Sequence, residues 1–199
     1  MAASAKHIGI LVFDDVEDLD AVGPWEVFSH WTHNHSEDGW TVSLLSRGGA
    51  SVTAAKGMVI GAHHALSTAP ALDVLVHPGG PGTRRLMRDE EHVAWVRAQR
   101  DHVPLMASVC TGALVYAAAG LLRGRPATTY WAALDELAAA DPSIQLRPTD
   151  RYVDDGDVVT SAGVSAGIDM ALHLVGRLAG RDRALQVRRG IQYDPAPPV

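Results

Sequence analysis

Cysteine is almost absent from this chain of 199 residues, which contains a single one, Cys110. One thiol cannot form a disulfide framework, and it cannot contribute to a zinc site built from several cysteines. Basic residues are also in deficit, with 17 Lys and Arg against 23 Asp and Glu, and the net charge of −6 argues against a nucleic-acid surface. No apolar run is long enough to span a membrane.

The overall composition is that of a globular protein with one domain, which we expect to cover residues 1–199. Hydrophobic residues make up 47% of the chain and charged residues 20%. The first residues run directly into a strand pattern and lack the apolar core of a signal peptide. We therefore expect a cytoplasmic location, where a free thiol stays reduced.

Apolar runs alternate with helical patterns along the chain. Short apolar segments predict buried strands, and Ala-rich or amphipathic segments between them predict helices. The expected strands are Ile8–Phe13, Trp40–Leu45, Asp73–His77 and the residues before Cys110, with a hairpin at Tyr152–Thr160 and a small ribbon within Ser51–His64. The expected helices start at Gly23–Pro24, Asp89, Cys110, Trp131, about Ile168 and about Asp182, and the tail Tyr193–Val199 is predicted to be extended. This alternation predicts an α/β fold, a doubly wound and mostly parallel sheet with helices on both faces.

Cys110 lies where a predicted strand ends and a predicted helix begins. The residues before it are apolar and follow Pro104, and the residues after it are small and Ala-rich. At such a corner the free N–H groups of the helix and the positive end of its dipole point at the sulfur. We expect this position to favour the thiolate, which is the nucleophilic form.

Other small or acidic residues also follow predicted strands, namely Asp20, Gly79, Gly80 and Gly163. The carboxyl ends of parallel strands meet at one edge of a doubly wound sheet, where ligands bind. We therefore expect these residues to gather around Cys110.

Several motifs of the chain occur together and in order. They are Leu19–Phe28 with its Asp-Ala-Val-Gly-Pro-Trp-Glu core, Pro78-Gly79-Gly80, Ser108-Val109-Cys110-Thr111-Gly112, Ala127–Trp131, Ser161–Asp169 and the Tyr-x-Pro-Ala-Pro-Pro tail. This series resembles the ThiJ/PfpI superfamily and, within it, the isonitrile hydratases, over nearly the whole chain. The resemblance implies a flavodoxin-like fold, also described as class I glutamine amidotransferase-like, with a nucleophile elbow. It also implies a homodimer that needs no cofactor.

The resemblance assigns roles to individual positions. It implies that Cys110 is the nucleophile, that Asp20 contacts the sulfur and that Thr111 helps to shape and activate the site. It places the backbone N–H groups of Gly79 and Gly80 beside the substrate or a developing negative charge, with Gly163 at the same edge and Trp131 near the pocket.

The chemistry of these residues fits the hydration of an isonitrile. A thiolate is a soft nucleophile, and its attack on the isonitrile carbon requires a proton for that carbon. Burial beside an anionic sulfur raises the pKa of a carboxyl group, so Asp20 is suited to hold this proton. Hydrolysis of the resulting thioimidate would release an N-substituted formamide.

Two positions depart from related proteins. Protease-like and glyoxalase-like members carry His directly after the cysteine, where this chain has Thr111. Isonitrile hydratases read Ala-Thr-Thr-His-Trp where this chain has Tyr130 in place of the histidine, and a tyrosine cannot act as a base near neutral pH. We therefore expect a difference in substrate shape or rate.

Plainer interpretations remain open. Cys110 alone could be an inert core residue, and Asp20 could simply cap a helix. A non-catalytic sensor domain like those of AraC-type regulators, or a thiol enzyme of the glyoxalase, deglycase or amidase type, would share several of these motifs. Three further segments invite metal-binding interpretations, but a polar helix end and turns are favoured for them: His30–His35, His63–His64 and Asp154–Asp157.

Overall fold

The structure is a computed structural model, and it describes residues 5–194. Most of the extended tail predicted from Tyr193 onward therefore lies outside the described residues. None of the helices in the described part of the chain is both long and apolar enough to cross a bilayer.

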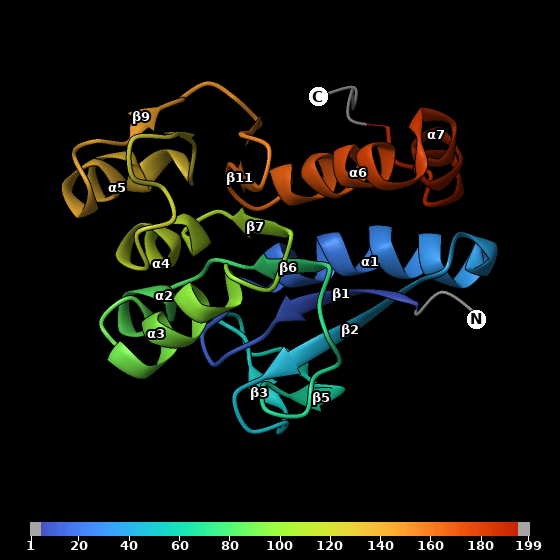
Figure 1. The fold of residues 1–199 in the computed structure, drawn as a ribbon, viewed down its shortest axis with the longest axis horizontal. Coiled ribbons are helices and arrows are strands. Elements are labelled where there is room, and N and C mark those ends of the chain that lie inside the picture. The colour runs from blue at the N-terminus through green and yellow to red at the C-terminus, as the bar shows by residue number, and fades with distance from the viewer. Residues whose placement is uncertain (1–4, 195–199) are drawn as a thin grey trace.

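A seven-stranded sheet forms the centre of the molecule, in the order β10-β11-β7-β6-β1-β2-β5 (Figure 1). Every pair in it is parallel except β10–β11, which is the predicted hairpin. Its strands are β1 (Lys6–Leu11), β2 (Trp40–Ser46), β5 (His64–Ala65), β6 (Val74–His77), β7 (Leu105–Val109), β10 (Tyr152–Asp154) and β11 (Val158–Ser161). The predicted ribbon after β2 is present as the antiparallel pair β3 (Val52–Thr53) and β4 (Val59–Ile60). A short parallel pair that was not predicted also forms, β8 (Pro126–Ala127) with β9 (Gln145–Leu146).

Helices cover both faces of the sheet, as predicted for a doubly wound fold. One layer contains α1 (Asp18–Asn34), α6 (Ala166–Ala179) and α7 (Arg181–Gly190), which lie side by side in Figure 1. The other contains α2 (Thr83–Leu86), α3 (Glu90–Gln99), α4 (Gly112–Ala118) and α5 (Leu134–Ala140). Two short 3₁₀ turns, η1 (Ser36–Asp38) and η2 (Trp131–Ala133), precede β2 and α5.

Side chains of β7 alternate between two hydrophobic cores, as the two-residue repeat of a strand requires. Ala107 and Val109 are buried in the core beneath α1, α6 and α7. Met106 is buried in the opposite core, beneath α3, α4 and α5. A strand covered on both faces is continuously apolar, which explains why these strands could be found from hydrophobic runs alone.

The predicted start of the first long helix is wrong. The helix begins at Asp18 rather than at Gly23–Pro24, so Pro24 lies inside it. Proline cannot donate the N–H that the carbonyl of Asp20 would normally accept, and this penalises an interior proline. Gly23 and Pro24 are both buried, with Gly23 close to Ile168 and Pro24 close to Gly167 of α6. Tertiary packing therefore outweighs the local preference against an interior proline.

The carboxyl ends of the parallel strands β1, β6, β7 and β11 lie at one edge of the sheet. Ser108 pairs with His77, and Val109 pairs with Ser161, so β6, β7 and β11 end nearly level. The segments that follow these strands carry the predicted site residues. The sheet therefore brings them together as the sequence led us to expect.

Candidate active site

Cys110 occupies a sharp turn between β7 and α4. Its φ angle is 56°, a left-handed conformation that a residue with a side chain adopts only under strain. The backbone holds it there, because its N–H faces the carbonyls of Ser161 and Ala162 and its own carbonyl accepts a 2.7 Å hydrogen bond from the hydroxyl of Thr129. These contacts place the thiol at the sheet edge with only 5% of the residue exposed.

Asp20 is fully buried in the first turn of α1 and interacts with the thiol of Cys110. Burial raises the pKa of its carboxyl group to about 7. The neighbouring thiol of Cys110 and the hydrogen bond from the backbone N–H of Gly79 favour the carboxylate and oppose this shift without cancelling it. The carboxyl group can therefore both hold and release a proton near neutral pH.

Asp20 does not cap its helix. The N-cap residue of α1 is Glu17, and Asp20 lies three residues further along the chain. The plain capping interpretation of Asp20 is therefore wrong.

The expected lowering of the Cys110 pKa is also wrong for the free protein. Burial, and after it the negative charge of Asp20, raise the pKa of the thiol to about 12. The backbone N–H groups of Thr111 and Val164 act in the opposite direction, as expected at an elbow, but they are outweighed. The thiol therefore keeps its proton until an acceptor takes it, and Asp20 is the acceptor beside it.

The turn after β6 is tied to the elbow by hydrogen bonds. The N–H of Gly79 donates to Oδ2 of Asp20 at 2.9 Å, and the N–H of Gly80 donates to Oγ1 of Thr111 at 2.9 Å. The hydroxyl of Thr83 donates to the same Thr111 oxygen at 3.0 Å. Both glycine N–H groups thus have acceptors within the protein, and they orient Asp20 and Thr111.

Gly79 occupies a position where a side chain does not fit. A Cβ atom there would lie 2.5 Å from the backbone nitrogen of Thr111, 2.7 Å from Oδ2 of Asp20 and 2.8 Å from Cβ of Cys110. Real Cβ atoms do not approach other heavy atoms so closely. Glycine at this position allows the turn to contact all three of these residues at once.

The loop between β11 and α6 completes the site. Val164 has a φ angle of 51°, and its backbone N–H interacts with both Cys110 and Asp20. A β-branched residue is rarely found in this conformation, so the loop is held under strain. Gly163 was predicted from the sequence and Val164 was not, because a main-chain donor leaves no signal in the type of side chain.

Gly163 lies against the ring of Tyr130, which leaves no room for a side chain at position 163. Tyr130 follows Thr129, which is bonded to the elbow, and its ring centroid is 5.4 Å from that of Trp131. Trp131 is 72% exposed. The two rings therefore extend from the elbow to the protein surface.

The metal-binding interpretations find no support in the described part of the chain, where no group of three His, Cys, Asp or Glu residues could hold an ion. At the end of α1, Nδ1 of His35 contacts the guanidinium of Arg183 and the carboxylate of Glu37. Nδ1 of His63 accepts a hydrogen bond from the N–H of Leu44. Asp154 is paired with His173 and Arg177. These residues have structural partners.

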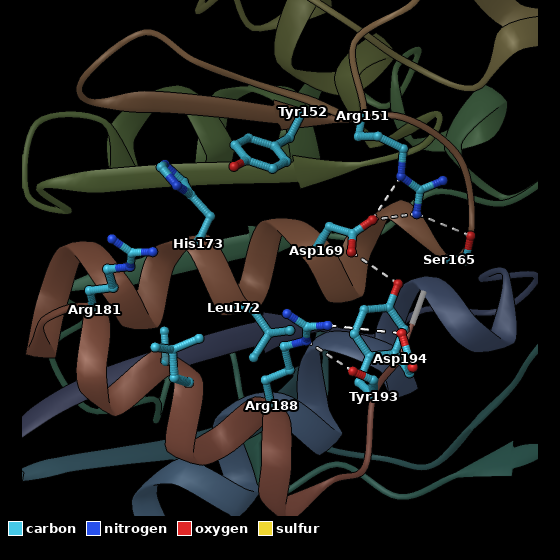
Figure 2. Close-up of a pocket in the computed structure, with 12 residues that line it drawn as sticks. Arg151, Tyr152, Ser165, Asp169, Leu172, His173, Arg181, Arg188, Tyr193 and Asp194 are labelled. Carbon is cyan, nitrogen blue, oxygen red and sulfur yellow. Dashed lines mark hydrogen bonds and ion pairs between the residues drawn. The ribbon is translucent and has the colours of Figure 1, made fainter. Parts of the chain in front are cut away.

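A pocket of about 890 Å³ lies between α6, α7 and the segment before β10. Figure 2 shows its lining, where Arg151 contacts Asp169 and Ser165, and Asp169 accepts the hydroxyl of Tyr193. Cys110 and Asp20 do not line it. The thiol and the Asp20 carboxyl group are therefore buried outside this pocket.

The sequence of this chain is similar to those of a known family and of individual known proteins. The DJ-1/PfpI family profile matches residues 6–177. Isonitrile hydratase of Pseudomonas putida is 40% identical over 195 residues, which cover 98% of this chain and 81% of that protein. The HTH-type transcriptional regulator GbdR of Pseudomonas aeruginosa is 33% identical over 189 residues, which are 95% of this chain but only 51% of the regulator. The chain thus spans about half the length of that regulator.

Solved structures agree on the fold. A ThiJ/PfpI family protein from Pseudomonas syringae superposes with a TM-score of 0.87 at 32% identity, over 98% of this chain and 77% of the other. Drosophila melanogaster DJ-1beta superposes with a TM-score of 0.83 at 22% identity, over 96% and 99% of the two chains. The second likeness is one of fold alone.

Proposed function

The chain belongs to the DJ-1/PfpI family, and from that premise we propose that it hydrates small isonitriles to N-substituted formamides, using Cys110 as the nucleophile. The observation that carries this proposal is the buried pair of Cys110 and Asp20, whose carboxyl pKa is about 7. The similarity to an isonitrile hydratase supports the choice of substrate class.

The first step joins the sulfur to the isonitrile carbon. The thiol proton of Cys110 passes to the carboxylate of Asp20, and Asp20 delivers it to the terminal carbon as the sulfur attacks that carbon. One S–C bond and one C–H bond form, and the product is a thioimidate attached to Cys110. General acid catalysis of this kind contributes about 10²–10⁴-fold to the rate.

The second step adds water and releases the product. Asp20, again a carboxylate, takes a proton from water as the water oxygen bonds to the thioimidate carbon, and the nitrogen receives that proton. The C–S bond then breaks, and the remaining hydroxyl proton returns to the sulfur through Asp20. The product is the formamide, and Cys110 and Asp20 are back in their starting states.

Neighbouring groups support these steps. The N–H groups of Thr111 and Val164 face the sulfur and stabilise the thiolate as it forms. The Thr111 hydroxyl, held by Gly80, fixes the turn that orients Asp20 through Gly79. We propose that Tyr130, Trp131 and Gly163 contact the substituent of the substrate.

The proposed reaction adds the elements of water and transfers no electrons to an acceptor, so it requires no cofactor. We further propose a cytoplasmic homodimer that acts on a small-molecule substrate and does not bind nucleic acid or membranes. The net charge of −6 is consistent with this choice of partners.

The test is to incubate the protein with an aryl isonitrile and an alkyl isonitrile and to follow the formamide by mass spectrometry. We expect turnover by the natural protein and loss of turnover in Cys110→Ala and Asp20→Asn. The control variant Asp18→Asn changes the same chemical group in the same turn of α1. Full activity in Cys110→Ala or Asp20→Asn would overturn the proposed mechanism.

A second candidate function is ligand sensing without catalysis. The similarity to GbdR over 95% of this chain favours it. A sensor would bind a small molecule, detected by calorimetry, while producing no formamide. Activity of the natural protein on methylglyoxal instead of isonitriles would indicate another thiol enzyme, of the glyoxalase or deglycase type.

A further inference from the structure

Two histidines form a buried pair next to the turn that orients Asp20. His77 is the last residue of β6 and is fully buried, and His92 lies in α3 and is 6% exposed. Their Nε2 atoms are 3.0 Å apart. The proposed reaction uses neither ring.

The neighbouring contacts determine which nitrogen carries each proton. Nδ1 of His77 lies 2.8 Å from the carbonyl oxygen of Pro78, and a carbonyl only accepts, so this Nδ1 carries hydrogen. Nε2 of a neutral His77 is then an acceptor. His92 must donate from its own Nε2. The pair therefore has one defined arrangement, and protonation of His77 would place two donors face to face.

Burial keeps both rings neutral at physiological pH. It lowers the pKa of His77 to about 3 and that of His92 to about 4. The charged groups near the two rings are Asp89, Arg47 and Glu91, which lie beside His92. The other aromatic rings packed on the pair are uncharged, namely Phe13 and Tyr116 beside His77, and Trp95 beside His92.

The peptide group between Pro78 and Gly79 connects the pair to the reactive site. Its oxygen accepts from His77, and its N–H donates to Asp20 at 2.9 Å. Hydrogen bonds at both ends of one peptide group polarise it and strengthen each other. Two glycines follow Pro78, so backbone sterics alone do not fix the orientation of this peptide plane, and the hydrogen bonds at its two ends determine it.

We propose that His77 and His92 are positioning residues that hold the Pro78–Gly79 peptide plane with its N–H directed at Asp20. This inference rests on the proposed role of the Asp20–Cys110 pair. The Nδ1–H group of His77 holds the carbonyl of Pro78, and the Nε2–H group of His92 holds the ring of His77 in place from the α3 side. Loss of His92 leaves Nε2 of the buried His77 without its donor, so the ring no longer has one preferred orientation toward the Pro78 carbonyl and its hold on the peptide plane weakens.

Within the Asp20–Cys110 pair, loss of this positioning affects Asp20 and not the thiol. The Gly79 N–H stabilises the carboxylate of Asp20 and does not bond to the sulfur. Without it the carboxyl pKa rises, and a larger share of the singly deprotonated pair carries its charge on the sulfur. The concentration of thiolate below the carboxyl pKa stays the same, because it depends only on the thiol.

Alkylation of Cys110 by iodoacetamide measures this directly, since the chain has no other thiol and the assay needs no isonitrile. We expect His92→Leu to move the midpoint of the rate–pH profile upward by about one pH unit and to raise the plateau rate about tenfold, the size of one hydrogen bond to a charged group. The acid limb of the profile should not move. His92→Gln, which keeps a donor near the same place, should retain the natural profile, as should His102→Leu at an exposed histidine.

Identical profiles for His92→Leu and the natural protein would overturn the proposal. Thermal unfolding checks that each variant is folded. If His92→Leu does not fold, the double variant His77→Leu/His92→Leu removes both nitrogens of the Nε2 contact and leaves only the Pro78 carbonyl without its donor, and unpaired carbonyls are tolerated more readily than unpaired N–H groups. This variant should fold and show the shifted profile. An unshifted profile in the folded double variant is equally decisive against the positioning role. If alkylation shifts as expected but formamide never forms, the proposed function fails and the positioning role stands.

Discussion

The carboxylate of Asp20 raises the pKa of the neighbouring Cys110 thiol, while the thiol lowers the pKa of Asp20. Both effects favour the state in which the sulfur keeps the proton and the carboxyl group carries the charge. In the proposed reaction the thiolate therefore forms by transfer of a proton within the pair and not through the helix dipole alone. The proposed mechanism uses the same proton for the substrate carbon.

Replacing Asp20 should change how stability depends on pH. Its pKa is about 7 in the folded protein and 3.8 ordinarily. A raised pKa contributes stability that is fully present below pH 3.8 and is lost as the pH rises to 7, with a slope of at most about 1.4 kcal/mol per pH unit. The free energy of unfolding of Asp20→Asn relative to the natural protein should therefore increase from pH 4 to pH 7 and then level off. Urea unfolding at several pH values measures this, with Asp18→Asn as the control, and a constant difference would show that Asp20 is not perturbed.

Thr111→Val should destabilise the fold and slow the reaction. Valine has nearly the same shape, but it leaves the buried N–H of Gly80 without its acceptor. An unpaired buried group of this kind costs about 1–3 kcal/mol. Thr111→Ser keeps the oxygen and should stay close to the natural protein in urea unfolding. Equal stability of the valine and serine variants would mean that the hydroxyl does not hold the turn.

Gly79→Ala should strongly reduce turnover, because the new Cβ atom would collide with Thr111, Asp20 and Cys110 at distances of 2.5–2.8 Å. At least one of these residues must shift, and a misplacement of about 1 Å costs about 10²-fold in rate. Gly61→Ala is a matched control, since nothing lies within 4 Å of a Cβ at that position. Formamide production at the natural rate by Gly79→Ala would exclude the described geometry.

Tyr130 and Trp131 should set the preference for substrates. Trp131 is 72% exposed, so Trp131→Ala should change the free energy of unfolding by no more than about 0.5 kcal/mol. If the ring contacts the substrate, KM for an aryl isonitrile should rise more than KM for a small alkyl isonitrile. Tyr130→His should also change the ratio of kcat/KM for the two substrates. Unchanged ratios in both variants would place the substrate elsewhere.

The mostly parallel sheet was predictable, because buried strands leave continuous apolar runs. The gathering of four residues at one edge of it was predictable too, since each follows a predicted strand: Asp20, Gly79, Cys110 and Gly163. The start of α1 was not, since packing of Pro24 near the start of α6 is a tertiary effect.

Features that depend on neighbours distant in sequence were also missed. The pKa of Cys110 follows from burial and from the nearby charge of Asp20, and local motifs report neither. The contact between His77 and His92 joins a strand and a helix, and neither residue is unusual in its own segment.

Rapid-quench mass spectrometry of the intact protein during turnover tests the proposed covalent chemistry most directly. Mixing with an aryl isonitrile should produce a species heavier by one whole isonitrile molecule, located on Cys110, which decays as the formamide appears. Cys110→Ala should form neither the adduct nor the product. Formamide released at the natural rate with no adduct on Cys110, or by Cys110→Ala, would contradict attack by the sulfur.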